Sequence, residues 1–483
     1  MKKISVLLAM GLLLGLLPGC GTGAERPVVT IPDNTVPEST TPQQTTPQET
    51  TPQATTPQET TPEEITPEET TPAPTTPTTP TEPKDFHLEI GDPVVVMQGA
   101  VGDDAWGHYQ FPGLSYTLDG NIVATWNYTN DTIGDYVNTV RKKVSLDGGK
   151  TWSDDESLCS VPNKFQMANG KYFAGFRRAN AHVSTWQNEY QPAVTWGSNN
   201  GYKLYFAEDM PKNEDTTVWG YEYDPETGKT VEFECTVNWP YASMVEYPGG
   251  KLYPMTQWFA LNQDNIIIKD GVMYLAMYTY GFNSYASSRE YASSDFCKYY
   301  STYIFTSEDN GRTWNFLSQL SVVGQTFTYS EGLCEPNLNI MPDGSIMILM
   351  RSGGPTSGDK GYPCYWARSS NNCKSWSVIK KFDDIGVLPQ MVTLSSGVSI
   401  ATYGRPYMRI RATNDPTGKT WKKAETFDMY SGEKNSSCYY TDLLALDDTH
   451  VLWIYSDFQY PNADGVPVKS IITRVITVVF DEE

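Results

Sequence analysis

The chain has 483 residues, a formal net charge of −22 at pH 7 and an aromatic content of 13%. This charge argues against nucleic acid or an anionic membrane surface as a partner. The sequence has only four histidines and no Cys-x-x-Cys pair. Neither a metal site nor a disulfide framework is therefore indicated, and we expect no cofactor.

Residues 1–20 are typical of a signal peptide. Lys2 and Lys3 provide positive charge, and residues 4–17 form an apolar run that is too short to span a bilayer as a helix. The run ends in Leu-Pro-Gly-Cys, which resembles a bacterial lipobox. We therefore expect Cys20 to be lipidated and to anchor the protein at the bacterial cell surface. Proline is not the commonest residue at the second position of this motif, so secretion with an unmodified Cys20 is the alternative.

Residues 21–85 predict a disordered linker. They repeat Thr-Thr-Pro-Gln and Thr-Thr-Pro-Glu, with almost no apolar side chains between Thr40 and Pro83. Such a segment cannot bury enough surface to offset its ordering entropy, and its prolines favour extended conformers. We interpret it as a spacer between the anchor and one folded domain at residues 86–483.

A short turn recurs four times in this domain. Residues 145–152 read Ser-Leu-Asp-Gly-Gly-Lys-Thr-Trp, and residues 307–314 read Ser-Glu-Asp-Asn-Gly-Arg-Thr-Trp. Residues 369–376 lack the Asp and the Gly, and residues 413–421 contain one extra position. In a tight hairpin, Asp accepts hydrogen bonds from backbone amides, Gly allows a positive φ, and Trp packs over the adjoining strand.

The segments around these turns predict short β-strands. Runs of β-branched and aromatic residues occupy positions 122–126, 137–144, 345–350 and 398–403, bounded by Asp-Gly, Ser-Gly or Asn-Gly turns. Short strands repeated over this length predict an all-β, six-bladed β-propeller. We expect a monomer. The aromatic-rich segment 193–259 is interpreted as the core of an enlarged blade, with a sugar-binding rim as the alternative.

The repeated turn resembles the Asp box of sialidases, which implies a sialidase-type propeller but no function by itself. Two further segments resemble functional parts of that family. Residues 335–351 are similar to the segment in which a Glu opens one strand and an Arg closes the next, with Glu335 and Arg351 at those positions. Residues 439–455 are similar to the strand pair that carries the nucleophile, with Tyr440 at its position.

Other family positions leave alternatives. Arg405 lies where sialidases carry another arginine for the substrate carboxylate, and Arg409 and Arg411 are the competing choices. Asp135 lies in the loop that carries the acid/base aspartate, and Asp131 lies in the same loop. Both choices rest on the resemblance and on the distance to the repeated turns.

One position departs from the family pattern. Sialidases open with Arg-Ile-Pro, whose arginine is the first of three that bind the carboxylate. Here Gln110 occupies that position. The loss of one charge-assisted hydrogen bond weakens binding by about 1.5–3 kcal/mol. Arg177 and Arg178 are the candidate replacements.

The resemblance implies a retaining exo-glycosidase that releases terminal α-linked sialic acid, or a related ulosonic acid, from a glycan. Tyr440 would attack the anomeric carbon, Glu335 would accept its proton, and Asp135 would protonate the leaving oxygen. Arg351 and Arg405 would hold the carboxylate. The alternatives are a different terminal sugar, which the missing arginine favours, and a propeller that binds glycans without catalysis.

Overall fold

The computed structural model describes most of the chain from residue 84 onward. The described ranges are 84–129, 140–155, 158, 165–177, 189–196, 201–206, 209–211, 216–239, 243–280, 299–321, 332–352, 362–427 and 437–481. The predicted signal peptide, the lipidation site Cys20 and nearly all of the predicted linker lie outside these ranges. Within them, no helix has both the length and the apolar character needed to cross a bilayer.

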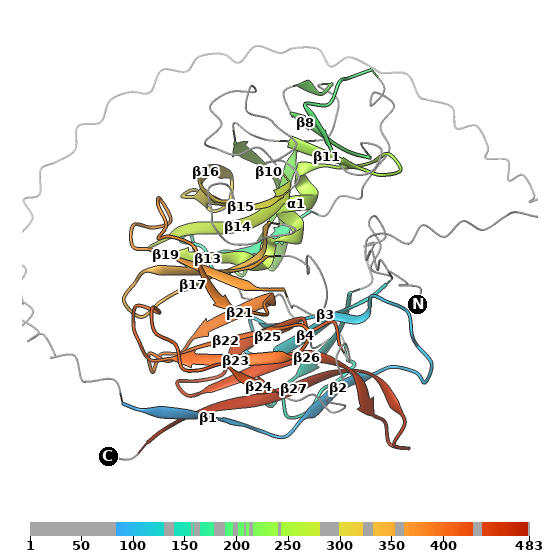
Figure 1. The fold of residues 1–483 in the computed structure, drawn as a ribbon, viewed down its shortest axis with the longest axis vertical. Helices are drawn as coiled ribbons and strands as arrows, with labels where there is room; N and C mark the ends of the chain where they lie inside the picture. The colour runs from blue at the N-terminus through green and yellow to red at the C-terminus, as the bar shows by residue number, and fades with distance from the viewer. Residues whose placement is uncertain are drawn as a thin grey trace, which may run out of the picture. The chain divides into compact units, whose positions relative to one another are not determined.

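Two four-stranded antiparallel sheets and one five-stranded antiparallel sheet follow one another from residue 333 onward, and the last of them also takes in the two N-terminal strands (Figure 1). The first contains β17 (Leu333–Ile340), β18 (Ile346–Ser352), β19 (Cys364–Ser369) and β20 (Lys380–Asp383). The second contains β21 (Val387–Thr393), β22 (Ser399–Gly404), β23 (Met408–Thr413) and β24 (Glu425–Phe427). The third contains β25 (Thr441–Ala445), β26 (His450–Pro461), β27 (Pro467–Phe480) and β1 (Phe86–Ile90), and β2 (Val94–Gln98) also pairs with β27.

The N-terminal half contains three more sheets or parts of sheets. One consists of β3 (His108–Tyr116), β4 (Ile122–Tyr128) and β5 (Val140–Ser145). A seven-stranded sheet joins β6 (Tyr172–Phe176), β9 (Val218–Asp224) and β10 (Lys229–Asn238) to β13 (Ile266–Lys269), β14 (Val272–Tyr280), β15 (Tyr300–Ser307) and β16 (Thr313–Leu320). A separate sheet contains β7 (Val194–Trp196), β8 (Tyr202–Phe206), β11 (Ser243–Tyr247) and β12 (Lys251–Tyr253). The α-helix α1 (Met255–Leu261) and the 3-10 helix η5 (Gln263–Asn265) precede β13.

The predicted all-β architecture is confirmed for the described residues. The strands expected at residues 122–126, 345–350 and 398–403 are present as β4, β18 and β22. The strand expected at 137–144 is described from residue 140 as β5. The number of six blades stays a prediction.

Consecutive sheets pack through their first strands, since β17 contacts β21, β21 contacts β25, and β25 contacts β3. Polar side chains between these strands are paired. Asn337 Nδ2 donates to Gln390 Oε1 at 2.9 Å between β17 and β21, and the Leu114 amide of β3 donates to Asp442 Oδ2 of β25 at 2.8 Å. These bonds satisfy buried polar groups and fix the position of one first strand against the next.

The aromatic segment 193–259 contributes mainly to the core. Tyr205, Trp239 and Trp258 are 2%, 6% and 5% exposed. Trp239 packs edge-on against Tyr303 at 4.9 Å between ring centroids. This agrees with the interpretation of the segment as part of an enlarged core.

The first three copies of the repeated turn share one hydrogen-bond scheme, whereas in the fourth the Thr413 hydroxyl donates to the Thr420 carbonyl. In the second copy, Asp309 Oδ1 accepts hydrogen bonds from the Ser307 hydroxyl (2.8 Å) and the Thr313 amide (2.7 Å). Ser307 Oγ in turn accepts one from the Gly311 amide at 2.8 Å. Gly311 has φ 82°, a conformation that costs glycine little. The turn is therefore closed by residues that are close together in the sequence.

The third copy keeps this scheme without Asp or Gly. Asn371 Oδ1 accepts from the Ser369 hydroxyl at 2.9 Å and from the Ser375 amide at 3.0 Å. Cys373 takes the glycine position with φ 61°. The carboxamide oxygen thus replaces a carboxylate oxygen, at the cost of a strained residue.

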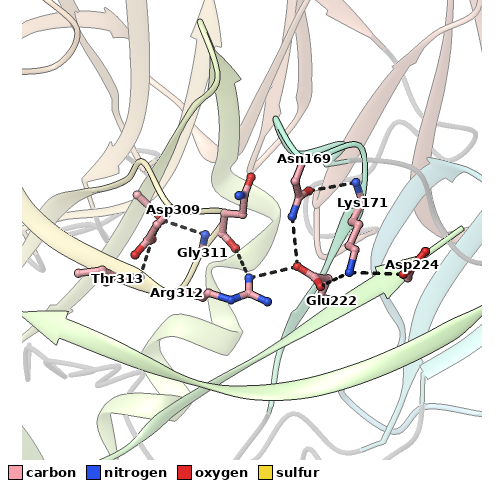
Figure 2. Close-up of polar contacts among 10 residues, drawn as sticks. Asn169, Lys171, Glu222, Asp224, Asp309, Gly311, Arg312 and Thr313 are labelled. Carbon is pink, nitrogen blue, oxygen red and sulfur yellow. Dashed lines mark hydrogen bonds and ion pairs between the residues drawn. The ribbon is translucent and has the colours of Figure 1, made fainter. Parts of the chain in front are cut away.

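The second turn also connects two groups of strands in the seven-stranded sheet (Figure 2). Arg312 Nη1 donates to Glu222 Oε2 of β9 at 3.1 Å, and Lys171 Nζ donates to the other carboxylate oxygen at 3.1 Å. The Arg312 guanidinium also lies 4.5 Å from the centre of the Phe233 ring. Glu222 is only 5% exposed, so its two cationic partners compensate a buried charge.

Strand register places the repeated turns at one end of the sheets. Ser369, which opens the third turn, pairs with Ile346 at the start of β18, whereas Arg351 near the end of β18 pairs with Cys334. In the sheet of β3, β4 and β5, Ser145 likewise pairs with Ile122 at the start of β4. The first and second strands of each sheet are antiparallel. The residues that begin the first strand and those that end the second strand therefore lie together at the end of the sheet away from the repeated turn.

Candidate active site

The predicted nucleophile and its predicted base are in direct contact at this opposite end. The Tyr440 hydroxyl donates a hydrogen bond to Glu335 Oε1 at 2.6 Å, although the residues are 105 positions apart. Arg351 Nη1 donates to the same oxygen at 2.8 Å, and the Leu388 amide donates to Oε2 at 2.9 Å. Glu335 is 6% exposed, so three donors fix a buried carboxylate.

The second arginine lies beside the first. The guanidinium carbons of Arg351 and Arg405 are 5.3 Å and 5.1 Å from the centre of the Tyr362 ring. Arg405 Nη2 donates to the Cys438 carbonyl at 2.8 Å, which connects it to the segment that carries Tyr440. Two cations therefore flank one aromatic ring next to the Tyr440–Glu335 pair.

The environment keeps Tyr440 protonated. Burial, followed by the nearby charge of Glu335, raises the pKa of its hydroxyl well above the usual value, while Arg351 and Arg405 oppose the shift. The Phe111 ring packs edge-on against the Tyr440 ring at 4.7 Å. At neutral pH the phenol is thus a neutral donor to a carboxylate.

Backbone strain is concentrated at this end. Ten described non-glycine residues have positive φ, and four of these lie in hairpin turns. The other six surround the candidate site: Tyr109, Phe111, Glu335, Leu388, Arg405 and Tyr439. Register shifts interrupt the β3–β4, β17–β18 and β21–β22 ladders at the same places. Strain and bulges of this kind redirect side chains and are typical of functional sites.

Gln110 occupies an unusual environment. Its side chain is fully buried, and within the described part of the chain neither its amide nitrogen nor its amide oxygen has a hydrogen-bond partner. It is adjacent in β3 to Phe111, which contacts Tyr440. An unsatisfied buried polar atom costs about 1–3 kcal/mol. Among the described residues, Gln110 is therefore an uncompensated polar group next to a residue that contacts Tyr440.

The competing arginines of β23 are held in other contacts. Arg409 Nη1 pairs with Asp383, and Arg411 Nη1 donates to the Phe382 carbonyl at 2.7 Å. Asp383 and Phe382 belong to the neighbouring strand β20. These contacts favour Arg405 as the arginine of the candidate site.

One predicted position is described away from the pair, and three others cannot be compared with it. Asp135, Asp131 and Arg178 lie outside the described residues. Arg177 follows β6, where its guanidinium lies 4.8 Å from the Trp219 ring centre and 3.6 Å from Glu232 Oε2. Its contacts with β9 and β10 hold it in its own sheet, and its role as a replacement cation stays a prediction.

Several neighbours of the site were not identified from the sequence. Leu388 acts through its backbone amide, which leaves no signal in side-chain pattern. Tyr362 and Tyr278, the latter close enough to affect the Tyr440 pKa, belong to a chain with 31 tyrosines. Phe111 follows Gln110 in the sequence, but neither its positive φ nor its contact with Tyr440 has a sequence signal. In the described part of the chain, no group of three His, Cys, Asp or Glu side chains is placed to hold a metal.

No family model matches the chain, and no curated protein matches it. Solved structures with a similar fold include a Hadza microbial sialidase, with 14% identity and a TM-score of 0.44, covering 79% of this chain and 68% of that one. A Fusarium graminearum α-L-arabinofuranosidase has 11% identity and a TM-score of 0.41, covering 80% and 97%. A Dyadobacter fermentans protein of unknown function has 15% identity and a TM-score of 0.44, covering 81% and 99%. Likeness at this level assigns no family or activity to this chain.

Proposed function

We propose that the chain is a retaining exo-glycosidase that releases a terminal α-linked sialic acid, or a related ulosonic acid, from glycans. The observation that carries the proposal is the 2.6 Å hydrogen bond from Tyr440 to Glu335, beside the guanidinium groups of Arg351 and Arg405. The proposal includes a six-bladed propeller, a lipid anchor at Cys20 and a spacer at residues 21–85.

A tyrosine nucleophile suits this substrate. The anomeric carbon of a sialic acid carries a carboxylate, which repels a carboxylate nucleophile, whereas a neutral phenol approaches without that repulsion. As Tyr440 Oη bonds to the anomeric carbon, its proton passes to Glu335 Oε1, which already accepts its hydrogen bond. The bond to the leaving oxygen breaks, and Asp135 protonates that oxygen.

The second step reverses the first. Asp135, now a carboxylate, takes a proton from water, and the water attacks the anomeric carbon. The bond to Tyr440 breaks, and Glu335 returns the proton to the phenol oxygen. Two displacements at one carbon retain its configuration. Arg351 and Arg405 hold the sugar carboxylate throughout, because guanidinium groups bind carboxylates in a bidentate manner.

The test is incubation of the purified protein with a panel of aryl glycosides that includes the α-sialoside, followed by identification of the released sugar and its first-formed anomer. Release of the α-anomer of sialic acid supports the proposal. Release of another sugar overturns the substrate assignment. Binding of glycans without any release favours a non-catalytic propeller.

One observation favours the second candidate, a glycosidase for a different terminal sugar. The buried amide of Gln110 lacks partners, and a sugar hydroxyl can both donate to its oxygen and accept from its nitrogen. Such a pairing would not require a carboxylate on the substrate.

The variant Gln110→Arg separates the two candidates. For a sialoside, we expect kcat/KM to stay level or rise by roughly tenfold, because a third cation reaches the carboxylate. In the absence of ligand the variant should be less stable, since it buries an unpaired charge, and sialic acid should restore its Tm. The measurements are steady-state kinetics and thermal unfolding with and without sialic acid. A fall in kcat/KM with no rescue of Tm would favour the other sugar.

A further inference from the structure

The loop before β3 and an extension of β26 together carry an aromatic pair, one exposed and one half-buried, here called the aromatic rim. It consists of Trp106, which is 52% exposed, and Phe458. Their rings meet edge to face, with centroids 6.4 Å apart and planes at 90°. A single exposed aromatic residue is common on protein surfaces and needs no explanation. The position and the support of this pair are less common.

Strand register places Phe458 at the end that carries Tyr440. Thr441, the first residue of β25, pairs with Tyr455 of β26. Because Tyr440 immediately precedes β25, the part of β26 beyond Tyr455 continues past the end of β25 on the Tyr440 side. Phe458 lies in this continuation. It therefore lies at the same end of the sheet as Tyr440 rather than at the repeated turns.

Contacts join this continuation to the predicted carboxylate site. The hydroxyl of Ser456 lies 2.9 Å from Cys438 Sγ, and the carbonyl of Cys438 accepts the hydrogen bond from Arg405. On the other side of the rim, Trp106 lies five residues before Phe111, whose ring contacts Tyr440. Both rim residues are thus linked through short segments to residues that touch the site.

A buried lysine supports both rim residues. Lys469 of β27 is 9% exposed, and its Nζ donates to the carbonyl of Ala105 at 2.5 Å. The same Nζ lies 5.0 Å from the centre of the Phe458 ring. The same ammonium group therefore contacts both the backbone beside Trp106 and the ring of Phe458. This pre-organises the rim in the absence of a ligand.

The surrounding charge is acidic. Asp103 accepts a hydrogen bond from His108 Nδ1 at 2.9 Å, and Asp104 is exposed in the same loop. Both carboxylates are close enough to Lys469 to raise its pKa, although burial has the larger effect and lowers it. Two carboxylates beside one ammonium group disfavour an anionic ligand and offer acceptors for hydroxyl groups.

We infer that Trp106 and Phe458 bind the neutral sugar to which the released residue is attached, an inference that rests on the proposed function. The indole face of Trp106 offers apolar surface to the C–H face of a hexose, and Asp104 offers an acceptor to its hydroxyls. The site thus takes a terminal acidic sugar linked to a neutral one. A second acidic sugar at the rim would be repelled by the carboxylates of Asp103 and Asp104.

The test compares two substrates that differ in the leaving group. α-Sialyl fluoride has no sugar beyond the scissile bond, whereas sialyllactose places a neutral disaccharide there. We expect Trp106→Ala to lower kcat/KM for sialyllactose by roughly tenfold, since the stacked surface is lost, and to change kcat/KM for the fluoride by less than about twofold. Trp106→Phe keeps an aromatic face and should recover most of the loss.

The control is Val378→Ala, which shortens a side chain that is 73% exposed in the segment between β19 and β20. It should alter neither substrate's kinetics. Equal losses on both substrates, or no loss on sialyllactose, would overturn the rim assignment while the proposed function stands. If the wild-type protein releases sialic acid from neither substrate, the proposed function fails and the rim assignment fails with it.

A second measurement tests the charge argument. The wild-type protein should hydrolyse sialyllactose with a kcat/KM roughly tenfold or more above that for α-linked disialic acid, because the second acidic sugar meets the carboxylates. Asp104→Asn should lower the ratio of kcat/KM for sialyllactose to kcat/KM for disialic acid. It should leave kcat/KM for α-sialyl fluoride unchanged. A wild-type preference for disialic acid would overturn the inference.

Discussion

The two ends of the sheets use polar groups in opposite ways. At the repeated turns, each Asp or Asn is bonded to residues a few positions away. At the other end, Tyr440 and Glu335 meet across 105 positions, and six of the described non-glycine residues have positive φ. Gln110 is buried there with no hydrogen-bond partner among the described residues. The turn end is thus closed by short-range hydrogen bonds, whereas the other end brings together residues that are distant in the sequence.

The difference extends to electrostatics. At the turns, hydrogen bonds lower the pKa of Asp147, with the Thr151 hydroxyl as the largest cause. At the candidate site, burial raises the pKa of Tyr440. The first shift stabilises the charged form of a structural group, and the second keeps a reactive group neutral until a proton acceptor is used. Substitutions at the turn end should therefore change the free energy of unfolding, whereas substitutions at the site end should change turnover.

The largest expected effect tests the site end. Tyr440→Phe removes one hydroxyl, so we expect turnover of the α-sialoside to fall on the order of 10³-fold or more, while the free energy of unfolding changes by about 1 kcal/mol or less. Steady-state kinetics and urea denaturation measure the two quantities.

Glu335→Gln serves as the companion variant, because it keeps the shape of the side chain and removes the proton acceptor. Its rate should also fall by orders of magnitude. If both variants retain rates near that of the wild type, the site end is not catalytic, and the contrast between the two ends loses its functional meaning.

The second effect tests the turn end. Arg312→Ala removes one of the two cations that contact buried Glu222 (Figure 2). We expect the free energy of unfolding to fall by about 1–3 kcal/mol, because a buried carboxylate loses a charged donor, with kcat/KM unchanged. Lys381→Ala is the matched control, since Lys381 and its partner Asp384 are both more than half exposed.

That control should cost about 0–1 kcal/mol, as is usual for exposed ion pairs. A loss of activity in Arg312→Ala at full stability would break the comparison, because it would couple the turn end to the site.

The two ends also differ in how far the sequence could predict them. The turns follow from short-range chemistry, so residues 145–152 and 307–314 predicted the turns themselves, and the runs at 122–126, 345–350 and 398–403 predicted strands that are present. Glu335 and Arg351 were placed by resemblance, and the β17–β18 hairpin brings residues of this spacing to one end of the sheet. Tyr440 was placed by resemblance alone, since its contact with Glu335 depends on how two sheets pack.

Other features of the site end had no sequence signal. The Leu388 amide bonds Glu335 only because both residues adopt positive φ at register shifts, which the residue types do not reveal. The burial of Gln110 likewise depends on an irregular β3. The contact of Trp106 with Phe458 joins segments 352 positions apart in sequence, and no local pattern predicts it.

The smallest expected effect concerns the pH dependence of the turns. Hydrogen bonds from the Thr151 hydroxyl and from backbone amides lower the pKa of Asp147 to about 2 in the folded protein. An unfolded Asp has a pKa of about 3.9. Because the folded value is the lower one, the stabilisation is fully present above about pH 4 and is lost as the pH falls towards 2.

Asp147→Asn removes the titrating group while keeping an oxygen acceptor, and Asn371 shows that this turn forms with a carboxamide. Asp147 is exposed, so we expect the variant to be less stable than the wild type by less than about 1 kcal/mol at pH 6. The difference should shrink at pH 3, because protonation then removes part of the same advantage from the wild type. Urea denaturation of both proteins at the two pH values measures it. A difference of equal size at both pH values would show that the carboxylate charge does not stabilise this turn, and that its hydrogen-bond geometry alone distinguishes the two ends of the sheets.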